Sequence, residues 1–485
     1  MRVLFVNWVD WRDALGRGGG VAVYERNLAR ALEGSGIEVG WLSSGLGHDL
    51  GRGAPPRWQA VPGQPGHYRI VNSAVLAPGQ LAWDSPAQLA DAGTEAAFAD
   101  FLAATGPWDA VQFDNIEGLP VSVLAVARAA GARVVPVLHN YYPVCPQVNL
   151  WHQERRNCQD FDQGRACVTC LPGGQTGPGA RRAALAVIWQ AEALGGRRLV
   201  PVAVAGLKAA RAGLGLLRRL RRRRAAPAAG PAAGPDPAAA ARFAARRAAM
   251  VAAINAQAHR VLCVSDRVRD LAAAHGLDPA LLQTARIGTP EAVRFDRAAP
   301  RPALCDDKGH VRLAYLGYMR RDKGFFFLLD ALEGLPPAIA ARLHLTVAAR
   351  RGPPEVMARL EALRPRLAGL DHVDGYTHAQ LDGLLQDVTL GVVPVLWEDN
   401  LPQVALEMHL RGIPLLTSDL GGARELGNCP DLVFRAGDAG AFAGRLAAVL
   451  GGDIDLTAYW AGARAPETMD GHLDVLRKVW SGSAG

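Results

Sequence analysis

The residues best suited to chemistry lie at positions 393–425, VPVLWEDNLPQVALEMHLRGIPLLTSDLGGARE. The pattern predicts a strand that ends at Val395 and a helix that begins near Pro402, because proline is favoured in a first helical turn. The loop between them, residues 398–401, brings a carboxylate and free backbone N–H groups to one place, where they suit hydroxyls and phosphate oxygens respectively. Glu407, further along the predicted helix, can accept two hydrogen bonds from ribose hydroxyls, a strong geometry for a charged acceptor.

Two series of alternating strands and helices must position this segment. The N-terminal series has predicted strands at residues 1–8, 37–42, 110–113, 133–138 and 260–264. The C-terminal series has predicted strands at residues 311–316, 343–348, 388–395 and 413–418, with helices at 325–332, 379–385 and 403–410. Such alternation predicts an α/β protein with two facing, doubly wound parallel sheets. Ligands bind such sheets at the carboxyl ends of their strands, so we expect the site in the cleft between the domains.

The length of 485 residues also favours more than one domain. We expect an N-terminal domain over residues 1–296, a C-terminal domain over residues 303–460 and a final amphipathic helix within residues 461–485. The first domain is predicted to contain a cysteine-bearing loop at residues 145–172 and a basic insert rich in Ala, Arg and Pro at about residues 173–250.

A glycine-rich loop, GRGGG at residues 16–20, separates the first predicted strand from a helix with apolar residues on one face. Together with the next strand it predicts a βαβ unit, whose glycines let a ligand approach the backbone at the positively polarised helix N-terminus. The glycine spacing differs from the G-x-G-x-x-G fingerprint, so it predicts no dinucleotide cofactor.

The run W-E-D-N-L-P-Q-V-A-L-E followed by G-I-P-L-L-T-S-D-L-G-G-A-R-E resembles the donor-site signature of retaining glycosyltransferase family 4, glycosyl transferases group 1. The resemblance covers both domains outside about residues 145–255 and implies the GT-B fold of two facing Rossmann-like domains. The family pattern is Glu, seven residues, Glu, and the matching positions here are Asp399 and Glu407.

In that family the first acid contacts hydroxyls of the donor sugar and the second contacts the ribose. The resemblance therefore implies these roles for Asp399 and Glu407, with further donor-binding residues between them at Asn400, Leu401 and Pro402. Because Asp399 is one methylene shorter than the family's glutamate, the identity of the donor sugar is open. Glu398, one residue earlier, is a candidate to compensate.

A second matching segment, LAYLGYMRRDKGFFFLLD at residues 313–330, resembles the family's strand, basic loop and helix. It implies donor binding by Gly317 and catalysis by Lys323. The family commonly has Arg directly after the first glycine, where this chain has Tyr318 and offers Arg320 or Arg321 instead; we assign the catalytic role to Arg320. Such cations neutralise a departing diphosphate, and positioned charge acting on developing charge is usually the largest catalytic contribution. A solvated basic turn is the alternative.

The resemblance extends to the N-terminal domain. It implies that Gly19 and Gly20 approach the phosphate or the acceptor, and that His139, in the strand-ending VLHN, is a catalytic residue near the reacting sugar. Because histidine serves many roles near neutral pH, only its place in this series favours that role. The resemblance further implies that Tyr376 contacts the base and that the final helix crosses back to the first domain.

Together these matches imply transfer of a sugar from a nucleoside diphosphate sugar to an acceptor hydroxyl, with retention at the anomeric carbon. No protein nucleophile is evident, so we favour front-face attack in which the departing phosphate helps to remove the acceptor proton. The expected acceptor is a saccharide or lipid-linked saccharide in envelope polysaccharide or glycolipid assembly. The alternative is a non-catalytic nucleotide-sugar-binding or membrane-recruited protein on a degenerate GT-B fold.

We expect catalysis to require no cofactor and no metal. Two Asp-x-Asp matches, at residues 160–162 and 453–455, do not follow a strand as that metal motif requires. The seven cysteines are too few for a disulfide framework and favour a reducing cytoplasm. Four of them cluster and predict either a structural zinc site or reduced, unliganded thiols: Cys145, Cys158, Cys167 and Cys170.

The positive charge is concentrated in one segment. Residues 171–250 hold fifteen Lys or Arg against two acidic residues, a net charge of +13, and because the whole chain carries +7, the rest carries −6. Residues 207–224, LKAARAGLGLLRRLRRRR, mix leucines with an arginine cluster and are followed by an Ala/Pro/Gly linker at residues 225–241. Two interpretations stay open: a helix that lies on anionic lipid, and a solvated loop. Specific nucleic-acid binding is disfavoured because the insert has almost no aromatic residues for base stacking.

The location follows from the same features. The apolar start of the chain is too short for a secretion signal, and no run reaches the length of about 18 apolar residues that crosses a bilayer. We therefore expect a cytoplasmic protein that associates peripherally with the inner face of the plasma membrane.

Overall fold

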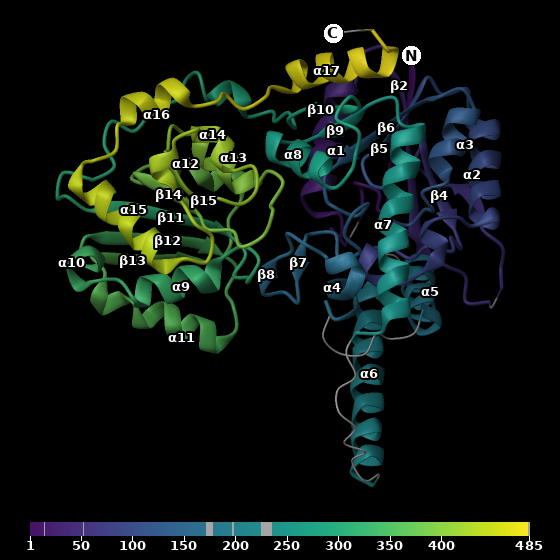
Figure 1. Ribbon diagram of the computed structural model, residues 1–485, viewed down its shortest axis with the longest axis horizontal. Helices are drawn as coiled ribbons and strands as arrows, with labels where there is room; N and C mark the ends of the chain where they lie inside the picture. Colours follow the sequence, from purple (N-terminus) through teal and green to yellow (C-terminus); the bar gives the residue numbers. More distant parts are fainter. Residues whose placement is uncertain (14, 52, 171–177, 196–197, 225–234, 484–485) are drawn as a thin grey trace.

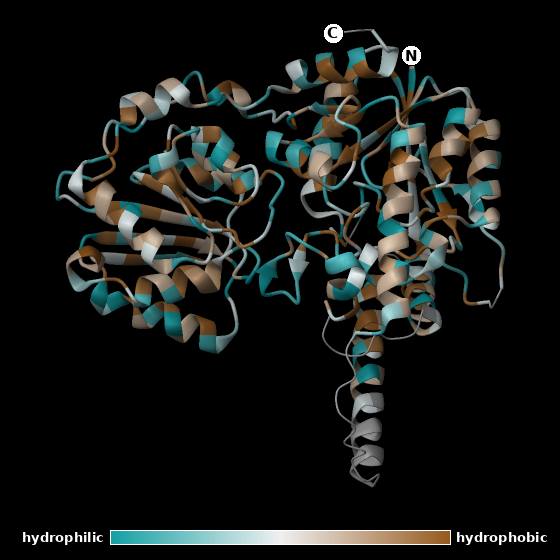
Figure 2. Ribbon diagram, in the orientation of Figure 1, coloured by the Kyte–Doolittle hydropathy of each residue, from teal (hydrophilic) through white to brown (hydrophobic). Residues whose placement is uncertain are grey.

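The computed structural model describes residues 1–13, 15–51, 53–170, 178–195, 198–224 and 235–483. Over these residues the chain folds into two α/β domains joined by two chain crossings (Figure 1). Apolar strands lie at the centre of each domain and helices of mixed polarity cover them (Figure 2). The predicted α/β class with two doubly wound sheets is confirmed.

The N-terminal sheet has the strand order β10-β9-β6-β5-β1-β2-β4-β3, and only the edge strand β3 pairs antiparallel within it. Its central strand β1 (Arg2–Asn7) is buried along almost its whole length, as expected of a parallel strand covered on both faces. The other strands are β2 (Glu38–Gly47), β3 (Arg57–Ala60), β4 (His67–Val71), β5 (Ala110–Phe113), β6 (Arg133–Leu138), β9 (Val261–Cys263) and β10 (Leu282–Thr284). The sheet is flanked by α1 (Gly19–Leu32), α2 (Ala92–Thr105), α3 (Val123–Ala129) and α8 (Asp266–Ala274).

The C-terminal sheet has the order β13-β12-β11-β14-β15-β16, with every pair parallel. Its strands are β11 (Val311–Gly317), β12 (Leu343–Ala349), β13 (Gly369–Val373), β14 (Leu390–Val393), β15 (Leu415–Ser418) and β16 (Val433–Phe434). One face packs against α9 (Phe325–Glu333), α10 (Pro337–Ala340), α11 (Pro354–Ala362) and α15 (Ala439–Gly451). The other face packs against α12 (Leu381–Leu385), α13 (Gln403–His409) and α14 (Arg424–Gly427).

A long insert separates β6 from β9. It begins with the hairpin of β7 (Trp151–His152) and β8 (Arg156–Asn157) and the short helix α4 (Arg165–Val168). Three longer helices follow: α5 (Pro178–Gly195), α6 (Leu199–Arg224) and α7 (Pro237–Gln257). Helix α5 packs against α6 and the end of β2, while α6 extends away from the body of the molecule (Figure 1).

The predicted linker at residues 225–241 is wrong at its C-terminal end. Its residues 225–234 lie outside the described part of the chain, and α7 already begins at Pro237. Asp236 caps this helix by accepting a hydrogen bond from the N–H of Ala238, and proline occupies the first helical position. Cap and proline together favour a helix start at this point, within the Ala-rich run that we had interpreted as a linker.

The C-terminal helix α17 (Met469–Ser481) lies on the N-terminal domain, after α16 (Leu456–Gly462) on the C-terminal one (Figure 1). His472 lies 2.9 Å from the hydroxyl of Tyr24, and the indole N–H of Trp480 donates to Gln112 at 2.9 Å. Trp480 is almost fully buried, so this helix completes the core of the first domain. Among the described residues, no helix combines the length and the apolar character needed to cross a bilayer.

Candidate active site at the domain boundary

The loop that follows β14 carries most of the predicted donor site, and a glycine pair shapes it. Gly421 has φ +71°, and a Cβ at this position would overlap the carbonyl oxygen of Asp399. The backbone N–H of Gly422 donates to that same carbonyl at 2.9 Å. The glycines of the sequence D-L-G-G are therefore needed because the backbone of the loop lies directly against them.

Lys323 and Asp399 meet across the C-terminal ends of β11 and β14. The ammonium nitrogen of Lys323 lies 2.5 Å from Oδ2 of Asp399, and the Asp399 side chain is only 9% exposed. Gly324 caps α9 with φ +74°, and a Cβ there would overlap the carbonyl oxygen of Pro394. Lys323 and Gly324 thus hold the basic loop in direct contact with the donor loop.

Arg320 is not brought into this pair. Its guanidinium donates to both carboxylate oxygens of Asp322, at 2.9 and 2.8 Å, and its side chain is 62% exposed. Tyr318, which stands at the position where the family has arginine, is 61% exposed. Of the two cations assigned to catalysis in this loop, the structure places Lys323 against Asp399 and leaves Arg320 at the surface.

Tyr376 and Glu407 come together at the other end of the predicted donor site. The Tyr376 hydroxyl donates to Oε2 of Glu407 at 2.8 Å, and Nε2 of His378 lies 3.6 Å from Oε1. Burial raises the pKa of Glu407 above its ordinary value, and burial and Glu407 together raise that of Tyr376. Gly317 ends β11 with φ +130°, and a Cβ there would approach Val404 on the same helix as Glu407. Gly317 and Tyr376 therefore both lie against α13, the helix that carries Glu407.

Hydrogen bonds join the N-terminal domain to the end of the donor loop and the start of α13. The side-chain N–H of Asn400 donates to the carbonyl of Leu138 at 3.2 Å, directly before His139. The side-chain N–H of Gln403 donates to the carbonyl of Gly20 at 3.4 Å. Helix α1 has Gly18 as its N-cap and no side-chain cap, so its first N–H groups are left for another partner. Gly19, Gly20 and His139 thus lie at the same boundary as Asn400, while Leu401 and Pro402 continue the loop into α13.

His139 lies beside acidic residues that the sequence analysis missed. Its Nε2 is buried without a hydrogen-bond partner and lies 3.5 Å from Oδ1 of Asp114. Oδ2 of Asp114 is likewise buried and unsatisfied. Burial and Asp114 raise the pKa of Glu25, which accepts a hydrogen bond from Asn7 at 3.0 Å. The only signal in the sequence is that Asp114 directly follows the apolar run of β5.

Glu398 does not compensate for the short acid at position 399. It is 1% exposed and accepts hydrogen bonds from Arg267 at 2.9 Å, from Asn157 at 3.0 Å and from the N–H of Gly421 at 3.0 Å. Its carboxylate is therefore already bound by Asn157 and Arg267 of the N-terminal domain and by Gly421 of its own domain. The structure overturns that part of the sequence interpretation.

A second carboxylate joins the domains nearby. Glu425 accepts hydrogen bonds from the backbone N–H groups of Asp266 and Arg267, at 3.1 and 2.7 Å, and from Arg286 at 3.1 Å. It thereby caps α8 from the other domain, where negative charge at a helix N-terminus is favourable. We call Glu398, Glu425, Arg267 and Arg286 the interdomain clamp.

A pocket of about 1130 Å³ opens beside this clamp. It is lined by Leu150, Asn157, Arg267 and His275 of the first domain and by Glu398 of the second. Burial, with Arg247 nearby, lowers the pKa of His275 to about 4. The pocket therefore lies between the domains, and the middle of the cysteine-bearing loop, with Cys158, forms part of its wall.

The four clustered cysteines are all within the described part of the chain and form no disulfide. Cys170 donates to Oε1 of Gln147 at 2.8 Å, and burial raises the pKa of both Cys167 and Cys170 to about 12. Among the described residues no group of three or more His, Cys, Asp or Glu side chains is arranged to hold a metal ion. The zinc site of Cys145, Cys158, Cys167 and Cys170 stays a prediction.

Comparisons with known proteins bear on this arrangement. Residues 310–451 match the family model of glycosyl transferases group 1. A search among curated proteins found no match. Among solved structures, HepE of Anabaena in complex with UDP aligns over 99% of this chain and 100% of its own, at 12% identity and a TM-score of 0.51.

Two further structures align over the whole of this chain. One is the lipopolysaccharide outer core galactosyltransferase WaaB, with 100% of its own chain covered, 12% identity and a TM-score of 0.55. The other is the N-terminal domain of trehalose-6-phosphate phosphatase from Candida albicans, with 97% covered, 11% identity and a TM-score of 0.56. At such identities the likeness establishes the fold. Residues 310–451 therefore match a glycosyl transferases group 1 domain, and the chain has the predicted GT-B fold.

Proposed function

We propose that the protein is a retaining glycosyltransferase that moves a sugar from a nucleoside diphosphate sugar to an acceptor hydroxyl. The observation that carries the proposal is the placement of two pairs, Lys323 with Asp399 and Tyr376 with Glu407, in a domain that matches glycosyl transferases group 1. HepE, whose fold this chain shares, was solved with UDP, so a uridine nucleotide is the first donor to test.

Each pair binds a different part of the donor: one binds the nucleoside, and the other binds the diphosphate and the sugar. Glu407 accepts the ribose hydroxyls and Tyr376 contacts the base, after the donor displaces their mutual hydrogen bond. Lys323 transfers its charge interaction from Asp399 to the diphosphate, which frees the Asp399 carboxylate to accept hydroxyls of the donor sugar. Gly317, Asn400, Leu401 and Pro402 complete the donor contacts. The free N–H groups of α1 at Gly19 and Gly20 suit the phosphate or the acceptor.

Transfer then proceeds on one face of the sugar. The bond between the anomeric carbon and the phosphate oxygen breaks, the acceptor oxygen bonds to that carbon on the same face, and the departing phosphate takes the acceptor proton. Lys323 stabilises the negative charge that develops on the phosphate. His139, next to the Asn400 contact, lies near the reacting sugar and contributes positioning.

The proposed location is the surface of an anionic membrane, with a saccharide or lipid-linked acceptor in envelope polysaccharide or glycolipid assembly. Helix α6 extends from the body, and its sequence ends in an arginine cluster. Exposed apolar side chains on the hairpin of α5 and α6 add contact area for lipid: Val187, Leu194, Leu199 and Val202. Deletion of residues 207–224 is expected to abolish flotation with phosphatidylglycerol vesicles, and unchanged flotation would refute the location.

Nucleotide binding is the test of the donor site. We expect one of UDP, GDP, ADP, CDP and TDP to raise the melting temperature of the purified protein, because a ligand that binds only the folded state stabilises it. Glu407→Gln should remove most of this shift, whereas Glu355→Gln, on the exposed face of α11, should keep it. No shift with any nucleotide, or equal shifts in both variants, would contradict the proposal.

One observation favours a second candidate, a non-catalytic nucleotide-sugar binder. Arg320 is held by Asp322 and Tyr318 replaces the family's arginine, so the described basic loop presents only Lys323 to the donor loop. A protein that binds the nucleotide and the nucleotide sugar equally well but releases no nucleotide with any acceptor mixture would be this binder. Steady nucleotide release from the nucleotide sugar would exclude it.

A further inference from the structure

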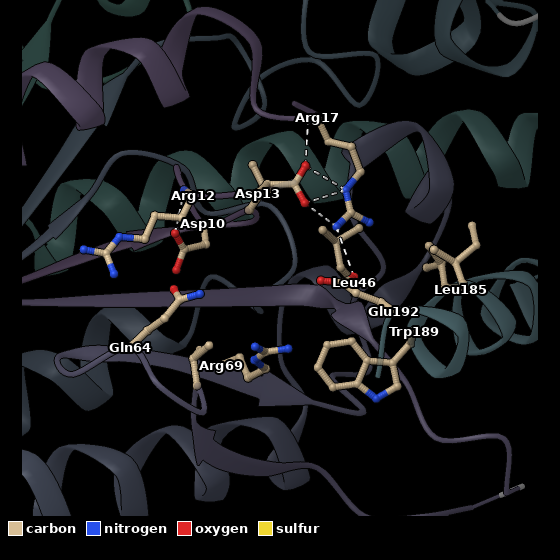
Figure 3. A pocket seen from close by; sticks show the side chains of 13 residues that line it. Asp10, Arg12, Asp13, Arg17, Leu46, Gln64, Arg69, Leu185, Trp189 and Glu192 are labelled. Atoms are coloured by element: carbon tan, nitrogen blue, oxygen red, sulfur yellow. Dashed lines mark hydrogen bonds and ion pairs between the residues drawn. The ribbon is translucent and has the colours of Figure 1, made fainter. Parts of the chain in front are cut away.

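A separate pocket of about 730 Å³ lies within the N-terminal domain (Figure 3). Its walls are the loop after β1, the ends of β2 and β4, and one face of helix α5. Helix α5 contributes Leu185, Ile188, Trp189 and Glu192. This helix belongs to the insert, which lies outside the segments that resemble the family, so the pocket is a feature of this chain.

The position of the pocket ties it to the proposed active site. Val9, Asp10 and Arg17 line it, and the same loop continues through Gly18 into α1, whose first turn contacts Gln403 of the donor domain. The pocket is thus on the first domain, beside the end of the central strand β1, where ligands of such sheets bind. A ligand held here lies on the acceptor side of the domain boundary.

The charges that line the pocket are unequally paired. Arg17 donates to both oxygens of Asp13 and lies 3.6 Å from Glu192, while Asp10 is 2.6 Å from His67. Arg69 is different, because no described residue accepts a hydrogen bond from its guanidinium, and Glu192 and Asp10 attract it only from beyond ion-pair distance. Figure 3 shows Arg17 turned toward Asp13 and Glu192, and Arg69 lying beside the ring of Trp189.

Arg69 is also partly buried. Its guanidinium lies 4.7 Å from the centroid of the Trp189 ring, and burial lowers its pKa from the ordinary value. A partly buried cation without a hydrogen-bonded partner is costly, and an anion in the pocket would relieve that cost. The planar guanidinium fork matches a carboxylate or a phosphate. Arg12, whose side chain lies over Trp11, adds a second guanidinium without a carboxylate partner among the described residues.

The remaining lining suits a sugar. Trp189 is a half-buried ring beside the guanidinium of Arg69, and Gln64, Asp10 and Glu192 offer oxygens to hydroxyls. We propose that this pocket binds the acceptor, a saccharide that bears a carboxylate or phosphate group, with Arg69 as the contact for the anionic group. The assignment as acceptor rests on the proposed glycosyltransferase function, and the preference for an anion rests on the pocket itself.

The test measures binding by saturation-transfer NMR, with and without UDP. The probes are glucuronic acid, glucose 6-phosphate and uncharged glucose. The wild-type protein should bind one or both anionic sugars about ten-fold more tightly than glucose, the size of one charged hydrogen-bonded contact. Whichever anionic probe binds better identifies the carboxylate or the phosphate as the preferred group.

Arg69→Gln should abolish this preference while leaving stabilisation by UDP unchanged. The matched control is Arg57→Gln on the neighbouring strand β3, whose side chain is 45% exposed and pairs with Asp49 outside the pocket. It should keep the preference. The proposal is overturned if Arg69→Gln keeps the preference, if glucose binds as tightly as the anionic sugars, or if no probe binds. A protein that shows Arg69-dependent binding but no response to any nucleoside diphosphate would instead refute the proposed function and leave the anion site standing.

Discussion

The donor and acceptor sides of this protein differ in how their charges are paired. In the C-terminal domain Lys323 pairs with Asp399 and Tyr376 donates to Glu407, so both carboxylates proposed to bind the donor already have a partner. In the pocket of the N-terminal domain, no described residue accepts a hydrogen bond from the guanidinium of Arg69, which Glu192 and Asp10 attract only from beyond ion-pair distance. A donor must therefore displace internal contacts, which lowers its affinity, whereas an anionic acceptor would meet a guanidinium that is free to bind it.

The strongest way to break this comparison is to remove the cation of the donor side. Lys323→Ala is expected to lower kcat/KM for sugar transfer by about 100- to 1000-fold, because charge that develops on the departing phosphate loses its nearest positive group. Nucleotide release in the presence of acceptor measures the effect. Lys308→Ala, at an exposed loop position, should leave the rate unchanged. Arg320→Ala should cost less than Lys323→Ala because Asp322 already holds Arg320, and the opposite ranking would reassign the role.

The C-terminal helix α17, which packs on the acceptor-side domain and carries His472, should make the stability of the protein depend on pH. Burial lowers the pKa of His472 to about 4 from an ordinary value of 6.5. Between these values the unfolded chain binds a proton that the folded chain does not, so the free energy of unfolding falls as the pH falls from 6.5 toward 4. Protonation linked to His472 is expected to lower the free energy of unfolding by about 3 kcal/mol over this pH range.

Urea unfolding at several pH values measures this loss. His472→Gln is expected to be less stable at pH 7 but to lose less on acidification, because the substituted residue does not titrate. Burial lowers the pKa of His48, His275 and His409 in the same direction, so part of the pH dependence should remain. An unchanged slope in the variant would show that His472 is accessible to protons in the folded state.

The backbone of the donor loop offers a third way to test the contrast. Gly421→Ala is expected to destabilise the protein by about 2 to 3 kcal/mol, because φ is positive there and the new Cβ would meet the carbonyl oxygen of Asp399. Gly444→Ala is the control, since Gly444 is exposed within α15 and a Cβ there meets no atom within 4 Å. It should stabilise slightly, as alanine does within a helix. Equal changes in the free energy of unfolding for the two substitutions would mean that the donor loop rearranges to accept the new Cβ without loss of stability.

The interdomain clamp should show the smallest effect. Glu398→Gln is expected to cost about 1 to 2 kcal/mol, because Glu398 is buried and Arg267 loses its charged acceptor. Glu361→Gln serves as the comparison, since that exposed residue pairs with Arg364 on the surface and such pairs contribute little. Equilibrium unfolding of both variants decides the ranking. A larger loss from the surface pair would show that the clamp does not join the domains in solution.

Local patterns were enough to locate most elements that carry the donor site. The strands at residues 110–113 and 133–138 have the bounds read from the apolar runs, and α9 and α13 end within one residue of their expected positions. These elements are short and bounded by Gly, Pro or polar residues, so neighbours along the chain determine them. The insert was harder, because an Ala-rich run is compatible with both linker and helix, and packing against α3 and α4 accompanies its helical form in α7.

For the candidate site, the sequence by itself determined which residues the donor loop contains, because their order along the chain forms a recognisable motif. Only the tertiary structure decided that Glu398 turns to Arg267, that Arg320 is held by Asp322, and that Arg69 meets Trp189 from an insert more than a hundred residues away. The physical reason is that a charge selects its partner from whatever the fold places within a few ångströms, and distance along the chain carries no information about that choice.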